Sequence, residues 1–343
     1  MNPNKGAPLA PEAKTRIREL IQEFGPGRHE GLVADLIENA LQLNRDVSDR
    51  GDVRTIQTAL RELRYAYRLF EGYRGIRKVS VFGSARTPSA APEYTQAVEF
   101  GQRIVDAGFM VITGAGGGIM QAANEGAGAE MSFGANIQLP FEQRANPVIE
   151  NDPKLINFRY FFTRKLNFIR QSDAIVLFPG GFGTMDEGFE TLTLMQTGKS
   201  RIRPLILMEP PGGSFWRTWD DYIKKHLLKN GLISRDDLHL YHHMEDPERA
   251  VQAIRRFYRN YHSSRFVQKL CVIRVRHLPS ETAIDALNED YADIIEGAPF
   301  HPIEPTKEER EDEDALEYPR LGFGFDRRHY GRFRQLIDTL NSF

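Results

Sequence analysis

The sequence predicts an α/β protein with a doubly wound parallel sheet of the Rossmann-like class, flanked by N-terminal helices and a small C-terminal extension. Short apolar runs alternate with segments of helical period between residues 78 and 262. Such alternation requires right-handed crossovers that set the strands parallel. Glycine-rich turns follow three of the apolar runs. Because ligands bind such sheets at the carboxyl ends of the strands, these turns mark the expected site.

Amphipathic helices are expected ahead of the sheet, at residues 12–24, 29–44 and 53–73, where apolar residues recur at helical spacing. Three helices alone cannot enclose a large hydrophobic core. We therefore expect the N-terminal helical segment, residues 1–75, to pack on the α/β body or on a second copy of the chain.

The α/β domain is expected over residues 76–264, as a run of alternating strands and helices. The expected strands are 79–82, 109–113, 133–139, 155–158, 174–178, 205–208 and 238–242. The helices between and after them are expected at 92–107, 119–129, 162–170, from about 185 onward, 215–230 and 247–262.

Residues 265–343 form an α+β extension of unknown role. Strands are expected at 270–275 and 320–325, and helices at 281–295 and 332–340. The charge run at 304–317 is expected to be a solvated loop.

Composition narrows the class of protein. The chain has 343 residues, with 41% hydrophobic and 27% charged residues, as expected of a soluble globular protein. A net charge of −2 gives no electrostatic case for nucleic-acid binding. The single cysteine, Cys271, excludes an internal disulfide and a cysteine-built metal site. Residues 1–14 lack the apolar core of a signal peptide, and no apolar run is long enough for a membrane helix. We expect a cytoplasmic protein without a cofactor, a metal ion or a membrane partner.

The stretch at residues 173–190, DAIVLFPGGFGTMDEGFE, organises the predicted site. It reads as a buried strand, a glycine turn and a helix that begins near Met185, with Thr184 as its cap and with Asp186 and Glu187 in its first turn. Free N–H groups and the helix dipole favour an anion there. An adjacent carboxylate suits a phosphorylated substrate with chemistry beside the phosphate. The alternative is that both carboxylates only complement the dipole.

The spacing of the glycines does not match three common glycine motifs. The turn at 114–118 has Ile119 where a dinucleotide fingerprint needs its third glycine. The fragment at 198–200, GKS, has Thr193 in place of the first P-loop glycine and is expected to end a helix. The turn at 83–87 lacks the second glycine of a serine hydrolase elbow.

Residues 179–187, PGGFGTMDE, match the PGGxGTxxE signature of the LOG (LONELY GUY) family at every fixed position. Residues 116–120, GGGIM, resemble its other glycine motif, although the run from 114 varies the usual pattern. The resemblance covers residues 76–262. It implies a Rossmann-like fold and the activity of the characterised members, which hydrolyse nucleoside 5′-monophosphates to free base and ribose 5-phosphate. The family is often labelled "possible lysine decarboxylase", but no lysine here stands out as a site for pyridoxal phosphate.

The resemblance also implies roles for residues. Glu187 would stabilise positive charge on the ribose or orient a water molecule, with the helix N-terminus helping to keep it ionised. Arg164 would be the second catalytic residue, which orients Glu187, clamps the phosphate or stabilises the leaving base. The implied substrate-binding residues are Ser84, Gly116, Gly117, Gly118, Met120, Lys165, Gly180, Gly181, Gly183, Thr184 and Asp186.

Several of these residues have alternative readings. Arg164 fits an exposed position on an amphipathic helix, Ser84 could cap its own turn, and Met120 could simply pack. Glu142 follows a predicted strand and is a weaker candidate for contact with the ribose.

Other function classes remain open at this stage. Related folds include carriers of the molybdenum cofactor, so a non-hydrolytic binding protein for a phosphorylated ligand is the alternative. A degenerate regulatory protein is the third reading, although the retained Arg164 and Glu187 argue against it. LOG-like proteins are typically dimeric and the 53–73 helix has an apolar face, so we expect a homodimer. No residue decides between N6-substituted adenine and ordinary purine or pyrimidine nucleotides.

Overall fold

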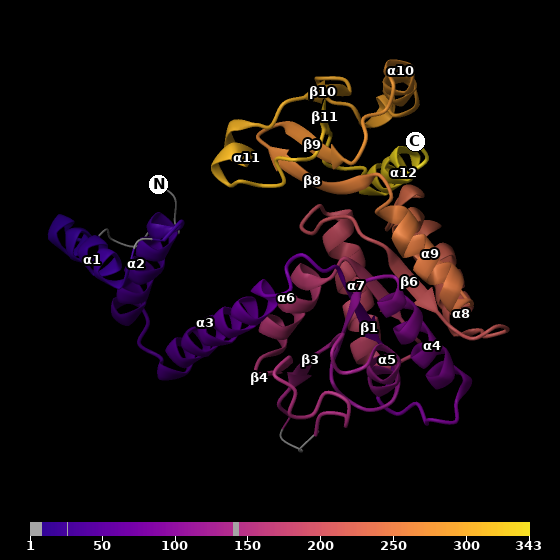
Figure 1. Cartoon of the computed structure of the whole chain (residues 1–343), viewed down its shortest axis with the longest axis horizontal. Helices are drawn as coiled ribbons and strands as arrows, with labels where there is room; N and C mark the ends of the chain where they lie inside the picture. Colours follow the sequence, from indigo (N-terminus) through magenta and orange to yellow (C-terminus); the bar gives the residue numbers. More distant parts are fainter. Residues whose placement is uncertain (1–8, 26, 140–143) are drawn as a thin grey trace. The chain divides into compact units, whose positions relative to one another are not determined.

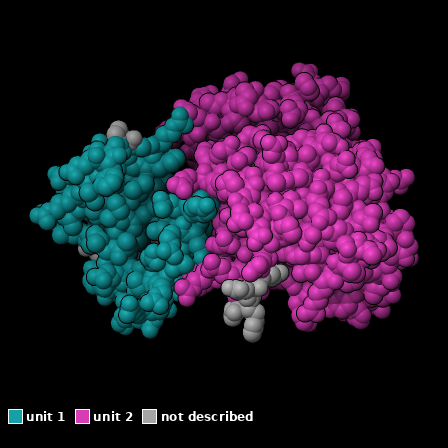
Figure 2. Space-filling view, turned by 60° about the horizontal axis from the view of Figure 1, so that its bottom comes forward, with its two compact units in different colours: residues 1–67 teal, residues 68–343 magenta. Residues whose placement is uncertain are grey.

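The computed structural model describes residues 9–25, 27–139 and 144–343. The chain divides into two compact units, residues 1–67 and 68–343, which Figure 2 shows in different colours. The first unit contains α1 (Pro11–Phe24), α2 (Glu30–Asp46) and most of α3 (Arg50–Glu71). An ion pair of 3.0 Å between Lys14 and Glu38 joins α1 to α2. The predicted helices of the N-terminal segment are thus confirmed.

The second unit is built on a parallel sheet of seven strands in the order β4-β3-β2-β1-β5-β6-β7. Figure 1 labels β1, β3, β4 and β6 of this sheet among the surrounding helices. The predicted fold class is therefore confirmed. The strands are β1 (Lys78–Phe82), β2 (Met110–Thr113), β3 (Ser132–Ile137), β4 (Leu155–Phe158), β5 (Ala174–Leu177), β6 (Leu205–Met208) and β7 (His242–Met244).

Helices cover both faces of this sheet. One face packs against α4 (Pro92–Asp106), α5 (Ile119–Ala127) and α9 (Pro247–Phe257) through a shared apolar core. Within β1, Val79 and Val81 point into that core, as the two-residue period of a strand requires. Phe82 points to the other face, where its ring lies 4.6 Å from that of Phe168. That face carries α6 (Phe161–Gln171) and α7 (Phe182–Gln196).

The structure corrects the prediction around β7. The strand predicted at 238–242 is a 3-10 helix over Asp236–Leu240, and β7 begins only at His242. The Asp237 carboxylate explains the difference, because it accepts hydrogen bonds of 2.7 Å from the Ser234 N–H and from the Gln196 side chain. A side chain that binds local backbone groups competes with strand pairing.

Some predicted helices are also shorter than expected, and the one predicted at 281–295 ends at Asp290. The helix predicted at 215–230 is α8 (Phe215–Tyr222), which continues as a π-helix over Ile223–Leu228. The helix predicted at 247–262 ends at Phe257, and β8 (Tyr261–Val267) follows directly.

The C-terminal part of the second unit contains an antiparallel sheet of four strands in the order β10-β11-β9-β8. Besides β8, its strands are β9 (Leu270–Val275), β10 (His301–Ile303) and β11 (Arg320–Gly324). The helices are α10 (Glu281–Asp290), followed by a 3-10 turn at Ala292–Ile294, α11 (Lys307–Glu311) and α12 (Tyr330–Leu340). The predicted strands at 270–275 and 320–325 are confirmed.

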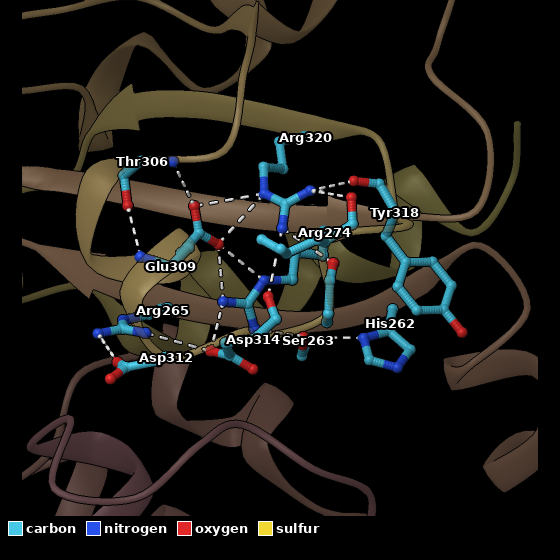
Figure 3. Close-up of polar contacts among 12 residues, drawn as sticks. His262, Ser263, Arg265, Arg274, Thr306, Glu309, Asp312, Asp314, Tyr318 and Arg320 are labelled. Carbon is cyan, nitrogen blue, oxygen red and sulfur yellow. Dashed lines mark hydrogen bonds and ion pairs between the residues drawn. The ribbon is translucent and has the colours of Figure 1, made fainter. Parts of the chain in front are cut away.

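The charge run at 304–317 is not the solvated loop that its composition predicted. It contains α11, and the side chain of Glu309 is fully buried. Figure 3 shows the reason: the Glu309 carboxylate lies between two buried guanidinium groups, 2.7 Å from Nη2 of Arg274 and 3.2 Å from Nε of Arg320. Both arginines lie on strands outside the charge run, and Arg274 is 35 residues from Glu309, so the charge run alone could not reveal this pairing.

Candidate functional site

The three glycine turns lie at neighbouring strand ends. They follow β2, β1 and β5, which are adjacent in the sheet. The order of strands reverses between β1 and β5, and such a reversal opens a crevice at the carboxyl edge of a parallel sheet. The fold therefore brings the two predicted signature motifs and the Ser84 turn to one place.

Ser84 connects the other two turns through its backbone. Its N–H donates a hydrogen bond of 3.1 Å to the carbonyl of Pro179, and its carbonyl accepts one of 3.1 Å from the N–H of Ile119. The Ser84 hydroxyl accepts a hydrogen bond of 3.1 Å from the N–H of Arg86, which is the turn-capping geometry considered from the sequence.

The glycines of the site fall into two groups. A Cβ atom at Gly118, where φ is 60°, would lie 2.3 Å from the carbonyl oxygen of Ser84, and one at Gly180 would lie 2.1 Å from Oγ1 of Thr184. These two glycines permit close packing of the turns. Gly181 and Gly183 instead have open space within 4 Å of such an atom. The open space lies at the N-terminus of α7, where backbone N–H groups lack helical acceptors.

The start of α7 differs from the prediction. The helix begins at Phe182, with Gly181 in the capping position, so Thr184 is not the cap. Thr184 is instead buried in the first turn, against Gly180. Asp186 and Glu187 consequently lie in the second turn, where the dipole effect is weaker because it falls off within the first turn. The dipole-complementing reading of these two carboxylates is therefore less favoured.

Glu187 is a buried carboxylate. Glu187 is 7% exposed to solvent. Its Oε2 atom has no hydrogen-bond partner within the described part of the chain. Burial raises the pKa of Glu187 to about 7, and the positive charges of Lys165 and then Arg164 oppose this rise. Desolvation outweighs the neighbouring positive charges in this balance, so burial acts against the expectation that the helix N-terminus keeps Glu187 ionised.

Arg164 projects from α6 toward the β2 turn. A Cβ atom at Gly114 would lie 2.6 Å from Nη2 of Arg164 and 2.7 Å from Sδ of Met120. The Arg164 guanidinium lies 5.2 Å from the centre of the Phe168 ring, and its buried Nε atom has no hydrogen-bond partner among the described residues. Burial lowers the pKa of Arg164, while the Glu187 carboxylate raises it. Arg164 is therefore half-buried beside the β2 turn and does not take the exposed position of the alternative reading.

Gly114 is a residue that the sequence analysis missed as part of the site. Its position at the start of the 114–118 glycine run was the available signal. Any larger residue there would push the Arg164 guanidinium away.

Lys165 and Asp186, both implied substrate-binding residues, pair with each other. Nζ of Lys165 lies 2.8 Å from Oδ2 of Asp186 and 2.9 Å from Oε2 of Glu190, so Lys165 joins α6 to α7. The sequence analysis did not select Glu190, although its spacing of four residues from Asp186 places both on one side of a helix.

Buried amides brace the β2 turn. The Asn146 side chain donates hydrogen bonds of 3.1 Å to the carbonyl of Gly116 and 3.0 Å to Oδ1 of Asn124. Oδ1 of Asn124 also accepts a hydrogen bond of 2.7 Å from the Thr113 hydroxyl. This support holds Ala115 at a φ of 60°, a conformation that favours glycine. No sequence pattern marked Asn146 or Asn124. Gly117 lies beside the Ser84 turn, whereas Glu142 is outside the described residues.

The described ranges contain no group of three or more His, Cys, Asp or Glu side chains placed to hold a metal ion. In the same ranges, no helix is both long and apolar enough to cross a membrane.

The parallel sheet with glycine turns at its point of reversal places this domain in the Rossmann-like class. The model of the family described as "Possible lysine decarboxylase" matches residues 117–254. This match and those to the curated proteins below confirm the resemblance to the LOG family.

Among curated proteins, the probable cytokinin riboside 5′-monophosphate phosphoribohydrolase LOGL5 of Oryza sativa subsp. japonica is 29% identical over 141 residues, which cover 40% of this chain. The cytokinin riboside 5′-monophosphate phosphoribohydrolase LOG of the same organism is 28% identical over 166 residues, or 47% of this chain. The matches span 55% and 65% of the lengths of these two relatives.

Among solved structures, that of TM1055 has 23% identity and a TM-score of 0.39, covering 52% of this chain and 98% of the other. The molybdenum cofactor binding protein from Rippkaea orientalis has 19% identity and a TM-score of 0.36, covering 52% of this chain and 94% of the other.

Proposed function

We propose that this protein hydrolyses the N-glycosidic bond of a nucleoside 5′-monophosphate, with residues 76–264 as the catalytic domain. The observation that carries the proposal is the buried, incompletely hydrogen-bonded carboxylate of Glu187, in the helix that follows the β5 glycine turn. Burying a carboxylate without partners is unfavourable, and such groups cluster at catalytic sites. The resemblance to phosphoribohydrolases supports the same assignment.

The N-terminus of α7 would bind the 5′-phosphate. Gly181 and Gly183 leave open space there, and helix N-termini bind phosphate through backbone N–H groups and the helix dipole. The ribose would then lie toward Glu187, one turn further along α7. The Arg164 guanidinium, held against Gly114, would complete the opposite side of the site.

The reaction replaces the bond between C1′ and the base nitrogen with a bond between C1′ and a water oxygen. The departing base takes the bonding electron pair and a proton, and the water molecule loses a proton. Positive charge that develops on the ribose would be stabilised by ionised Glu187, which would also accept the proton from water. Arg164 would stabilise negative charge on the phosphate or on the leaving base.

The test measures ribose 5-phosphate release from AMP, GMP, IMP, CMP, UMP and N6-prenyl AMP. We expect release from at least one nucleotide, and a loss of about 10²–10⁴-fold in kcat for Glu187→Gln. Glu289→Gln, which changes an exposed glutamate of α10, is the matched control and should leave kcat unchanged. Folded protein that binds AMP but releases nothing would overturn hydrolysis in favour of a non-hydrolytic binding protein.

We also propose that the protein is a homodimer. On α3, the side chains of Ile56 and Leu60 are 48% and 52% exposed, and an apolar face of this kind favours association. Light scattering at micromolar concentration should give twice the chain mass, and a monomer would contradict the proposal.

A further inference from the structure

A cluster of cationic side chains lies at the amino-terminal edge of the parallel sheet, opposite the glycine turns. Arg77 immediately precedes β1, and Arg201 lies shortly before β6. Arg276 follows β9 in the C-terminal sheet, where its N–H donates a hydrogen bond of 2.8 Å to the carbonyl of Asn260. We call these three arginines the rear cluster. Its members come from segments far apart in the sequence and belong to the same compact unit.

The geometry around Arg77 and Arg201 is well defined. The Arg77 guanidinium lies 3.6 Å from the centre of the Tyr258 ring, and the Tyr258 hydroxyl donates a hydrogen bond of 2.7 Å to the carbonyl of Asp173. Nη2 of Arg201 lies 3.2 Å from Oδ1 of the same Asp173, and the Arg201 side chain remains 44% exposed. The cluster is therefore anchored to the protein and still open to solvent.

Further positive charges lie beneath the cluster, and the Asp173 carboxylate acts on both of them without forming an ion pair with either. Nζ of buried Lys78 donates hydrogen bonds of 2.6 and 2.7 Å to the carbonyls of Tyr73 and Ile76. The buried Arg203 guanidinium donates to the carbonyls of Ile169 and Ser172. Carbonyl oxygens satisfy these donors, but they leave the net charges in place.

Few carboxylates oppose this charge. Asp173 is fully engaged, because its Oδ2 atom accepts a hydrogen bond of 2.9 Å from the Lys78 N–H while Oδ1 pairs with Arg201. Glu317, the other carboxylate that acts on this region, has an exposed side chain. Among the described residues, neither Arg77 nor Arg276 forms an ion pair with a carboxylate.

The electrostatic environment reflects this imbalance. Burial lowers the pKa of His262 on β8 to about 4, and the positive charges of Arg77, Arg274 and Arg276 contribute to the lowering. Burial also lowers the pKa of Arg77. Tyr258 and Asp173 oppose this lowering, whereas Arg276 and Arg201 add to it. Arg77 and Arg276 therefore act on each other and on the same His262 ring, which stacks on Tyr318 at 4.0 Å (Figure 3).

We propose that the rear cluster binds a phosphate-bearing anion. Guanidinium groups match phosphate oxygens through paired hydrogen bonds. The cations here outnumber the Asp173 carboxylate that pairs with Arg201, and such an excess of positive charge concentrates anions at a surface. Such a site is separate from the one in which Glu187 lies, because it occupies the opposite ends of the strands. The proposal does not depend on the proposed hydrolysis.

Inorganic pyrophosphate is the probe, measured by isothermal titration calorimetry on the full chain. We expect binding that Arg276→Gln weakens about tenfold or more, because one guanidinium contact is lost. Arg276 is exposed, so this substitution should not impair folding. The matched control is Arg249→Gln, an exposed arginine near the other end of α9, which should leave the affinity unchanged.

A second readout is thermal unfolding. Pyrophosphate should raise the Tm of the wild-type protein and of Arg249→Gln, and raise that of Arg276→Gln much less, because a ligand of the folded state stabilises it by mass action. Absence of pyrophosphate binding by the wild-type protein would overturn the proposal. Unchanged affinity of Arg276→Gln for pyrophosphate would also overturn the proposal. Pyrophosphate would then bind at another site, such as the glycine turns.

Discussion

Two buried carboxylates of this molecule differ in how well they are paired. Glu309 in the C-terminal sheet contacts two buried guanidinium groups, and its capping box with Thr306 satisfies it further. Glu187 in the α/β domain has a buried oxygen without a hydrogen-bond partner in the described part of the chain. Both lie close to arginines, so the presence of an arginine does not separate them.

This difference in pairing indicates that Glu309 has a structural role, whereas Glu187 is available to a ligand. The neighbours of Glu309 hold its pKa below the ordinary value, despite the opposing effect of burial. Burial instead raises the pKa of Glu187 to about 7. A satisfied buried carboxylate fixes the surrounding chain, whereas an unsatisfied one retains capacity for a ligand. The following predictions test this comparison, from the largest expected effect to the smallest.

Glu309→Gln should destabilise the protein strongly, because it leaves Arg274 and Arg320 buried without their shared carboxylate. Loss of one partner of a buried ion pair costs about 3–5 kcal/mol. Urea unfolding should show this decrease in the free energy of unfolding. Glu311→Gln, in the same helix but with an exposed ion pair to Lys307 of 3.6 Å, should change stability by less than about 1 kcal/mol. Equal effects of the two substitutions would contradict the structural role of Glu309.

Glu187→Gln should stabilise the protein at pH 8. A pKa raised from 4.5 to about 7 means that the folded state retains a proton that the unfolded state has lost. The stability associated with that proton is present below pH 4.5 and is lost as the pH rises through about 7. The neutral amide avoids this loss, worth at most about 3 kcal/mol. Unfolding of both proteins between pH 4 and 8 should show a difference that grows with pH.

Glu289→Gln is the control for that experiment, because its exposed side chain should give no pH-dependent gain. A Glu187→Gln protein that is less stable than the wild type at pH 8 would show that the carboxylate is satisfied after all.

The activity should rise with pH through about 7 if ionised Glu187 acts in hydrolysis. Lys165 is the strongest of the charges that lower the pKa of Glu187. Lys165→Met should therefore move the rising limb of kcat/KM to higher pH, by about half a unit to one unit. Lys229→Met, which removes an exposed lysine, is the control and should leave the limb in place. A limb at the same pH in Lys165→Met would exclude Glu187 as the titrating group.

Much of the α/β domain was predictable because its strands are short apolar runs and its turns are rich in glycine. The strands at 155–158 and 205–208 were predicted with the observed bounds. The strand predicted at 238–242 is a 3-10 helix over most of its length. Asp237 accepts hydrogen bonds from the Ser234 N–H and the Gln196 side chain, and the spacing of apolar residues does not predict such bonds. The start of α7 was misplaced because Thr184 has the residue type of a cap, whereas packing against Gly180 determines its position.

The site was predictable to the extent that local motifs encode it. The resemblance selected Glu187 and Arg164, and the fold brings their helices to the same sheet edge. The raised pKa of Glu187 depends on burial among distant segments, so the sequence suggested the opposite effect. Asn146 and Asn124 act through contacts between separate loops, and no spacing rule identifies such residues.

The two hydrogen bonds that join the three glycine turns both use backbone atoms of residue 84. These two hydrogen bonds therefore do not depend on the side chain at position 84, although the Ser84 hydroxyl accepts a hydrogen bond within its own turn. Proline is the exception, because it has no N–H to donate to Pro179. The geometry of the crevice thus depends on the N–H and C=O groups of one residue, and every amino acid except proline supplies both groups.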